Sequence, residues 1–257
     1  MKKIVLVSFL FCVHSLMAQT YMSVNFKNGN ATTFNVDSID SIVYHSTTCP
    51  VLTDVDGNNY SVVAIGNRCW MKENLRTTHY NDGTSISTGL SNADWQTTMN
   101  GAYADYNNDT AISSIYGRLY NWYAVANPAG LCPTGWHVMN EFDWNYLIKF
   151  IDLTADTTCN GCFQGSTVGG SMKEMGLLHW ITPNTGATNS SGFTGLPAGF
   201  RDNYGSYMDL GVLGYWQSAN QYSATDNYYH ALYYNKTNIF KSFIKKAYGV
   251  SVRCAQD

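Results

Sequence analysis

Apolar and polar residues alternate along two stretches of the chain, a period that is typical of strands buried on one face. The first stretch covers residues 22–26 and 34–36, separated by the turn-forming residues 27–30. It predicts a β-hairpin within 21–44, with a turn or single helical turn and a further strand over 37–43. An isolated hairpin is marginally stable in water, so we expect it to pack on the rest of the chain or on another molecule.

The second alternating stretch begins at residue 54, after a polar linker that predicts a domain boundary near residue 47. Asp56-Gly57 and Gly66-Asn67 are turn signals, and apolar residues alternate with polar ones between and after them. The pattern therefore predicts short antiparallel strands joined by these two turns.

Two segments have apolar residues at helical spacing. In 116–126 they recur three or four residues apart until the stop signal Asn127-Pro128. A second helix is expected to follow Asn140, which can cap it. Its apolar face consists of Trp144, Leu147, Ile148 and Ile151.

The remaining segments predict loops and a C-terminal group of strands. Residues 77–114 and 182–214 are rich in Asn, Asp, Ser, Thr and Gly, which favour irregular structure, and 169–180 can begin with a short helix. Alternation then predicts a meander of four strands at 215–219, 228–235, 239–244 and 248–254.

The N-terminal residues and the cysteines indicate an exported protein. A basic start, an apolar run and the small residue Ala18 are typical of a signal peptide, here 1–18. Of seven cysteines, Cys12 leaves with that peptide, and an even number in an exported chain favours disulfides. The sequence alone leaves their connectivity open. We expect the pairs Cys132 with Cys254, Cys49 with Cys69, and Cys159 with Cys162.

The first of these disulfides would join the loop that opens 130–152 to the last strand, 248–254. The ends of one domain would then meet, and we expect the rest of the chain to be organised around this pair.

Composition excludes several classes of partner. Charged residues make up 13% of the chain and the net charge is −3, so the sequence supplies no basic stripe for nucleic acid and no polybasic patch for anionic lipid. After the signal peptide, no apolar run is long enough to span a bilayer. The 19 Tyr and seven Trp fit a secreted binding protein. The alternative is that most of these rings fill a β-rich core.

Motifs for catalysis are absent from the sequence. It contains no GxSxG and no HExxH, and no cysteine has an evident histidine partner, so we expect no catalytic residue. The histidines of the exported chain occur singly and are expected to be packed or on the surface: His45, His79, His137, His179 and His230.

Two spacings suggest metal or redox chemistry only weakly. Asp54, Asp56 and Asn58 are spaced as in a calcium loop, but Ile65 stands where such a loop needs Glu. Cys159 and Cys162 have CxxC spacing without a second CxxC, which favours a disulfide in a surface loop. We therefore expect no metal and no cofactor.

Ordered stretches of this sequence resemble the Fibrobacter succinogenes major paralogous domain, a family of exported proteins abundant in Fibrobacter and Bacteroidetes. They are TDVDGNNYSVVAIGNRCWMKENLRTTHYNDGT, YGRLYNWYAV, GLCPTGWHV, HWITPNTGATNSSGFTGLPAGFR, GYWQSAN and GVSVRC. The resemblance covers nearly everything from residue 50 onward, which implies one domain over 48–257 after a hairpin segment and linker over 19–47. The hairpin is similar to N-terminal segments of many exported Bacteroidetes proteins.

The order of the expected elements is also similar to that of a C-type lectin. This resemblance implies an α+β fold with two main helices, short antiparallel strands and a long irregular loop. The layout of 116–151 is similar to that of sulfatase-modifying formylglycine-generating enzymes, but their cysteine pair has no counterpart before the C-terminal end. The acidic residue of a calcium-dependent lectin loop is missing before Pro183-Asn184. The resemblance therefore implies architecture and not function.

The long loop 180–216 is the candidate binding site, because its rings could stack on sugars and its amides could bond to hydroxyls. The candidate ligand-binding residues are Trp180, Asn184, Asn189, Arg201, Tyr204, Tyr207 and Trp216. The alternative is that Trp180 and Trp216 form the core of the loop itself.

We expect an extracellular or surface-displayed, non-catalytic binding or adhesion module for a glycan or a surface protein, with the periplasm as the alternative location. The alternative functions are a structural component of a cell-surface complex, assembled through the hairpin, and an uncharacterised enzyme.

Overall fold

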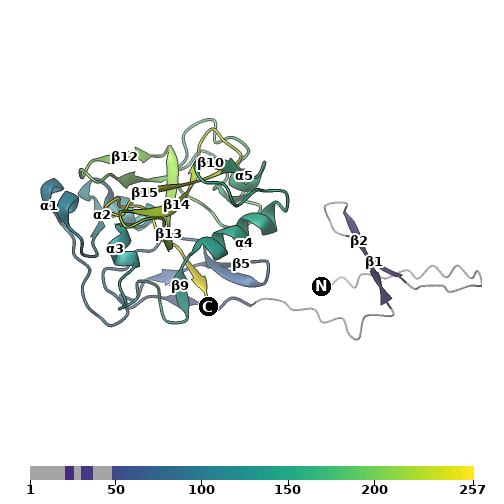
Figure 1. Ribbon diagram of the computed structural model, residues 1–257, viewed down its shortest axis with the longest axis horizontal. Helices are drawn as coiled ribbons and strands as arrows, with labels where there is room; N and C mark the ends of the chain where they lie inside the picture. Colours follow the sequence, from purple (N-terminus) through teal and green to yellow (C-terminus); the bar gives the residue numbers. More distant parts are fainter. Residues whose placement is uncertain (1–20, 26–29, 37–47) are drawn as a thin grey trace, which may run out of the picture. The chain divides into compact units, whose positions relative to one another are not determined.

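The computed structural model (Figure 1) describes residues 21–25, 30–36 and 48–257. The chain divides into two compact units, Met1–Ser46 and Thr47–Asp257, at the position where a boundary was expected. The expected signal peptide, 1–18, and the turn and strand expected over 37–43 lie outside the described residues.

The smaller unit contains the expected hairpin. Strand β1 (Tyr21–Asn25) pairs antiparallel with β2 (Ala31–Asn35), so this prediction is confirmed. The Phe34 side chain is 44% exposed.

The larger unit is built on two sheets and two short strand pairs. The strands of the large sheet are β10 (Cys162–Gln164), β11 (Ala198–Arg201), β12 (Tyr207–Leu210), β13 (Leu213–Gln221), β14 (Asp226–Tyr233) and β15 (Ile239–Lys245). The strands of the small sheet are β5 (Val62–Ile65), β6 (Arg68–Met71), β9 (Trp136–Val138) and β16 (Cys254–Gln256). The short pairs are β3 (Leu52–Thr53) with β4 (Asn59–Tyr60) and β7 (Tyr103–Ala104) with β8 (Leu119–Tyr120).

The strand order is β10-β15-β14-β13-β11-β12 in the large sheet and β5-β6-β16-β9 in the small one. Neighbours pair antiparallel except β11 and β13, which pair parallel. Strand β16 at the end of the chain therefore lies between β6 near the start of the domain and β9, which confirms the expected meeting of the domain ends.

Short helices connect these sheets. They are α1 (Asn92–Thr97), the 3₁₀ turn η2 (Tyr106–Asn108), α2 (Thr110–Tyr116), α3 (Trp122–Val125), α4 (Glu141–Ile151) and α5 (Val168–Met172). The helix expected after Asn140 is confirmed as α4. The Asn140 side chain accepts hydrogen bonds from the backbone N–H groups of Phe142 and Asp143, and Asp143 accepts one from the Asn140 N–H, which completes a capping box.

Helix α4 lies between the two sheets (Figure 1). Its buried residues Trp144, Leu147 and Ile148 pack in one cluster with residues of both sheets, among them Trp70 and Trp216. This packing explains why the apolar face that was expected from the sequence is buried.

A buried arginine ties the C-terminal segment to three other parts of the domain. The Arg253 guanidinium donates to Asn74 Oδ1 at 2.8 Å and to the carbonyl oxygens of Phe193 and Thr194. It also lies 4.0 Å from the centroid of the Phe193 ring. Trp216 Nε1 donates to the same Asn74 oxygen at 2.8 Å. Four of the sequence stretches quoted above thus meet around Arg253, where they stabilise the fold.

All three expected disulfides are present. Their Cα–Cα distances are 5.5 Å for Cys49–Cys69, 6.0 Å for Cys132–Cys254 and 6.2 Å for Cys159–Cys162, within the range that a disulfide can bridge. The α+β class is also confirmed, by the mixture of helices and strands.

The prediction of a single helix over 116–126 is wrong. Helix α2 ends at Tyr116, because Gly117 adopts a left-handed φ of 81°. A strand follows, and Asn121 then caps the separate short helix α3 by accepting a hydrogen bond from the Ala124 N–H. The helical spacing of apolar residues here arises from three short elements.

Three other expectations need correction. The loop expected over 182–214 contains β11 and β12, and 77–114 contains α1, β7 and most of α2. The prediction of a strand over 248–254 is also wrong. This segment makes single bridges from Gly249, Val250 and Ser251 to three different elements before it enters the small sheet, so the C-terminal meander has three strands, β13 to β15.

Candidate functional site

Four of the seven candidate ligand-binding residues lie in the interior: Trp180, Asn184, Arg201 and Trp216. Trp180 Nε1 donates to the Gly195 carbonyl at 3.0 Å, and the Asn184 amide donates to the carbonyls of Glu174 and Gly176. Arg201 lies over the Trp95 ring at 4.3 Å. These side chains hold the loop in place, and the buried rings of Trp180 and Trp216 pack in the core, as in the packing alternative.

The other three candidates are nearer to the surface. Tyr204 is 63% exposed, whereas Asn189 and Tyr207 are half-buried. Asn189 exchanges hydrogen bonds with Thr194 through its amide nitrogen (3.0 Å) and oxygen (2.8 Å). Tyr207 receives the Arg201 guanidinium over its ring at 5.2 Å. The contacts thus bring Arg201 and Tyr207 together, while Asn184 bonds to the segment before the loop and Asn189 to another part of the loop.

Each histidine of the larger unit contacts a carboxylate. The pairs are His79 with Asp56 (2.5 Å), His137 with Asp143 (2.8 Å) and Asp257 (2.6 Å), His179 with Glu174 (2.9 Å), and His230 with Glu141 (3.1 Å). Both ring nitrogens of His137 are engaged, and the hydrogen bond to Asp143 raises its pKa. His45 lies outside the described residues.

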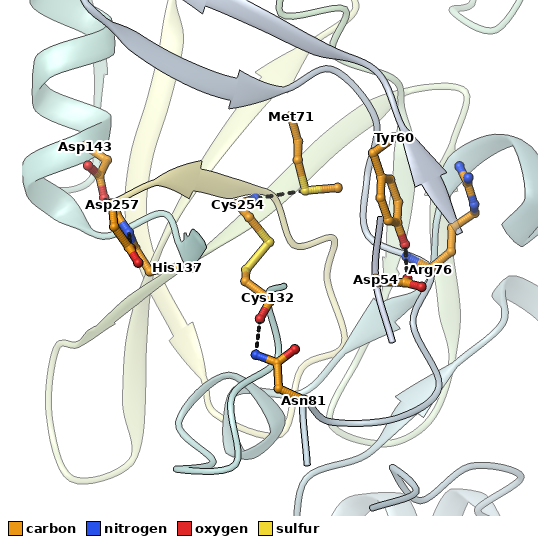
Figure 2. Close-up of a disulfide and its surroundings, with 10 residues drawn as sticks. All are labelled: Asp54, Tyr60, Met71, Arg76, Asn81, Cys132, His137, Asp143, Cys254 and Asp257. Carbon is orange, nitrogen blue, oxygen red and sulfur yellow. Dashed lines mark hydrogen bonds and ion pairs between the residues drawn. A yellow bond between two sulfur atoms is a disulfide. The ribbon is translucent and has the colours of Figure 1, made fainter. Parts of the chain in front are cut away.

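One hollow, of about 500 Å³, is lined partly by Asp54, Asn81 and Trp136, and also by Pro133, which follows Cys132 of the Cys132–Cys254 disulfide. Figure 2 shows His137, Asp143 and Asp257 on one side of this disulfide, and Asp54 with Tyr60 on the other.

The polar groups around this hollow bond to one another. Asn81 donates to the Cys132 carbonyl, and the Tyr60 hydroxyl donates to Asp54 at 2.6 Å. Asp54 also accepts hydrogen bonds from the backbone N–H groups of Asp56 and Asn58. Asp54, Asp56 and Asn58, which are spaced as in a calcium loop, therefore form a hydrogen-bonded turn. Among residues 21–25, 30–36 and 48–257, no group of three His, Cys, Asp or Glu side chains could hold a metal ion.

A second hollow, of about 460 Å³, lies at the C-terminal end of α4. Its lining comes from β5, the end of α4, α5 and the long loop, which contribute Gly66, Phe150, Ser171, Ser190 and Ser191 among others. We call it the α4 hollow. Part of the loop that was expected to bind a ligand thus borders a concave surface, although the loop does so through residues other than the seven candidates.

An exposed row of aromatic residues leads along α4 to this hollow. Phe142 is 64% exposed and Phe150 is 56% exposed, and the half-buried Tyr146 lies between them. The rings of Tyr146 and Phe150 are nearly parallel, with an interplanar angle of 16° and centroids 6.3 Å apart. We call Phe142, Tyr146 and Phe150 the α4 stripe.

The α4 stripe is held in position by its neighbours. The Tyr146 hydroxyl donates to Asn67 Oδ1 at 2.7 Å, and the Arg68 guanidinium lies 4.8 Å from the Phe142 ring centroid and 5.1 Å from that of Tyr146. Arg68 is in turn paired with the buried Asp143 at 2.7 Å. These contacts fix the middle of the stripe while Phe142 and Phe150 stay exposed.

The sequence reasoning missed the α4 stripe, although a signal for it was present. Aromatic residues recur at i, i+4 and i+8 over 142–150, which places them on one side of a helix. That side is opposite to the apolar face that was recognised. A helix that is apolar on both sides was the available sign that one side meets something other than the core.

Over the described residues, no helix is both long and apolar enough to cross a membrane. Neither a curated protein nor a solved structure matches this chain. The model of the Fibrobacter succinogenes major domain matches residues 63–256, and the chain belongs to that family.

Proposed function

We propose that the protein is an exported, non-catalytic binding or adhesion module that contacts its ligand through the α4 stripe and the α4 hollow. One observation carries the proposal: α4 buries one apolar face in the core and leaves Phe142 and Phe150 more than half exposed on the other.

Exposed rings on a rigid helix are suited to recognition. Burying a fully exposed Phe side chain contributes about 1.5 to 3 kcal/mol, and Phe142 and Phe150, which are more than half exposed, can supply part of that. The capping box and the core packing already order the helix, so binding does not have to order it. A contiguous aromatic surface next to a hollow is the usual arrangement at a binding site.

Export and a C-type lectin-like architecture are part of this proposal. Three disulfides favour an oxidising compartment, which supports export. The pairing of β16 with β6, which joins the domain ends next to the Cys132–Cys254 disulfide, supports the architecture.

The test compares binding of the wild type to intact cells and surface extracts with that of a Phe142→Ser/Phe150→Ser variant. We expect the variant to lose retention while its thermal unfolding midpoint stays close to that of the wild type, because both side chains are exposed. The matched control is Phe163→Ser, which changes a 41% exposed ring on β10. Equal retention of all three proteins would contradict the proposal.

A second candidate function is assembly into a surface complex through the N-terminal hairpin. It is favoured by the 44% exposure of Phe34 on a unit whose described part is a two-stranded sheet. Deletion of residues 21–44 is expected to abolish surface retention while leaving the unfolding of the larger unit unchanged. Unchanged retention would remove this candidate.

A further inference from the structure

We infer that the ligand of the α4 stripe and the α4 hollow is a neutral glycan chain, bound without a metal ion. This inference rests on the proposed function and adds the chemical class of the ligand. The walls of the hollow, the length of the stripe and the charge around it carry the inference.

The residues that line the α4 hollow are uncharged and partly polar. They include no Asp, Glu, Lys or Arg, and three of them are serines: Ser171, Ser190 and Ser191. An ionised group would find no opposite charge here after losing its water, which disfavours phosphate, sulfate and carboxylate ligands. Hydroxyl groups both donate and accept hydrogen bonds, as do the hydroxyls of a sugar.

The stripe is long enough for a chain of sugars. Phe142 and Phe150 are eight residues apart on one helix, which corresponds to about 12 Å along its axis. This length exceeds one sugar ring. An aromatic face attracts apolar C–H groups, and a pyranose ring presents such groups on one face and hydroxyls at its edge. A glycan lying along α4 could therefore place C–H faces on Phe142 and Phe150 and hydroxyls in the hollow.

The Arg68 charge beside the stripe is paired within the protein. Arg68 covers part of the Phe142 and Tyr146 rings, but its ion pair with Asp143 at 2.7 Å balances its charge. Asp143 is buried and also bonds to His137 at 2.8 Å. Arg68 is thus already paired within the protein, which makes it a weaker partner for an acidic glycan.

The loop side of the hollow is held in place before binding. The two hydrogen bonds between Asn189 and Thr194 close the segment that carries Ser190 and Ser191. The Ser191 hydroxyl donates to the Ser171 carbonyl at 2.8 Å, which joins this segment to α5. A pre-formed polar wall favours recognition of hydroxyl groups at fixed positions.

Affinity electrophoresis of the full exported chain tests the inference. The gels contain xylan, mannan or a mixed-linkage β-glucan as neutral probes, and polygalacturonate or heparin as acidic probes, and each gel is run with and without EDTA. We expect at least one neutral gel to retard the wild type. Phe150→Ala, and Ser190→Trp, which fills the hollow, are each expected to raise the dissociation constant at least tenfold. Phe163→Ala is the control and is expected to change nothing.

The outcomes separate the ligand class from the proposed function. Retardation by acidic gels only, loss of retardation in EDTA, or equal retardation of Phe150→Ala and wild type would overturn the inference. Retardation by none of the gels, together with stripe-dependent retention on cells, would overturn the glycan while the binding function stands. If the stripe variants are retained as well as the wild type, both on cells and on every gel, the glycan ligand and the proposed binding surface are both overturned.

Discussion

Arg253 is a buried cation whose contacts are oxygen acceptors and aromatic rings. The planar shape of its guanidinium group therefore matters for stability as much as its charge does. Arg253→Lys keeps the charge but cannot reach Asn74, Phe193 and Thr194 together. We expect the free energy of unfolding to fall by about 2 to 4 kcal/mol, measured by urea denaturation.

The control for this substitution is Lys245→Arg, at a side chain that is 60% exposed. A surface change of this kind should alter stability by less than about 0.5 kcal/mol. Equal stabilities of Arg253→Lys and the control would show that Arg253 does not hold the segments together.

Buried His230 makes stability depend on pH. Burial lowers the pKa of His230 below 6.5, although its hydrogen bond to Glu141 acts in the opposite direction. Burial alone would raise the pKa of Glu141, but His230 and Lys241 lower it to about 2. The unfolded chain therefore takes up a proton at His230 at higher pH than the folded chain does. Stability from this group is present above pH 6.5 and is lost as pH falls toward the folded pKa.

The measurement is the urea midpoint of the wild type and of His230→Gln between pH 8 and pH 5. We expect the variant to lose part of the decline that the wild type shows below about pH 6.5. His137 has a raised pKa, so its contribution has the opposite sign and is lost as pH rises. Parallel curves for wild type and variant would rule out this role for His230.

Single residues were predictable where the effect is local. Asn140 caps the next helix through hydrogen bonds to residues two and three positions later, and the six cysteines outside the expected signal peptide form the three expected disulfides. The orientation of Trp180 and Trp216 was not predictable, because an aromatic ring in a polar loop can face either way. Trp180 is held by a hydrogen bond to the Gly195 carbonyl, whose position depends on the loop conformation. Trp216 is held by a hydrogen bond to Asn74, which is distant in the sequence.

At the scale of elements, α4 is the helix on which the core and the proposed binding surface both depend. Removing its cap by Asn140→Ala should lower the free energy of unfolding by about 1 kcal/mol. Asn140→Asp keeps an acceptor for the N–H groups of Phe142 and Asp143 and should be close to neutral. Denaturation curves in which both variants match the wild type would contradict the role of this cap.

The elements that were predicted correctly have regular periods and local end signals, as α4 and β13 to β15 do. The errors concern segments that meet several partners in turn. Residues 249–251 bridge to Arg201, Tyr120 and Trp216, and 116–126 is divided by Gly117 and Asn121. Such contacts depend on the tertiary structure, which a period along the sequence does not contain. The same limit applies to the α4 hollow, whose walls come from four separate segments.

At the scale of the whole molecule, the three disulfides should differ in their contribution to stability. The Cys132–Cys254 pair spans 122 residues and Cys159–Cys162 spans three, which corresponds to about 5 and about 2 kcal/mol in the chain-entropy model. Replacing each pair by serines should therefore lower the thermal midpoint most for Cys132–Cys254. A larger loss for Cys159–Cys162 would contradict this order.

The most direct measurement for the binding surface is hydroxyl-radical footprinting of the wild type, with and without a polysaccharide that retains it. Aromatic side chains react with the radical when they are exposed. Bound ligand should protect Phe142, Tyr146 and Phe150 and leave Tyr204 and Phe163 as reactive as before. Protection of Tyr204 or Phe163, with the three α4 rings unchanged, would place the ligand elsewhere and contradict the proposed binding surface.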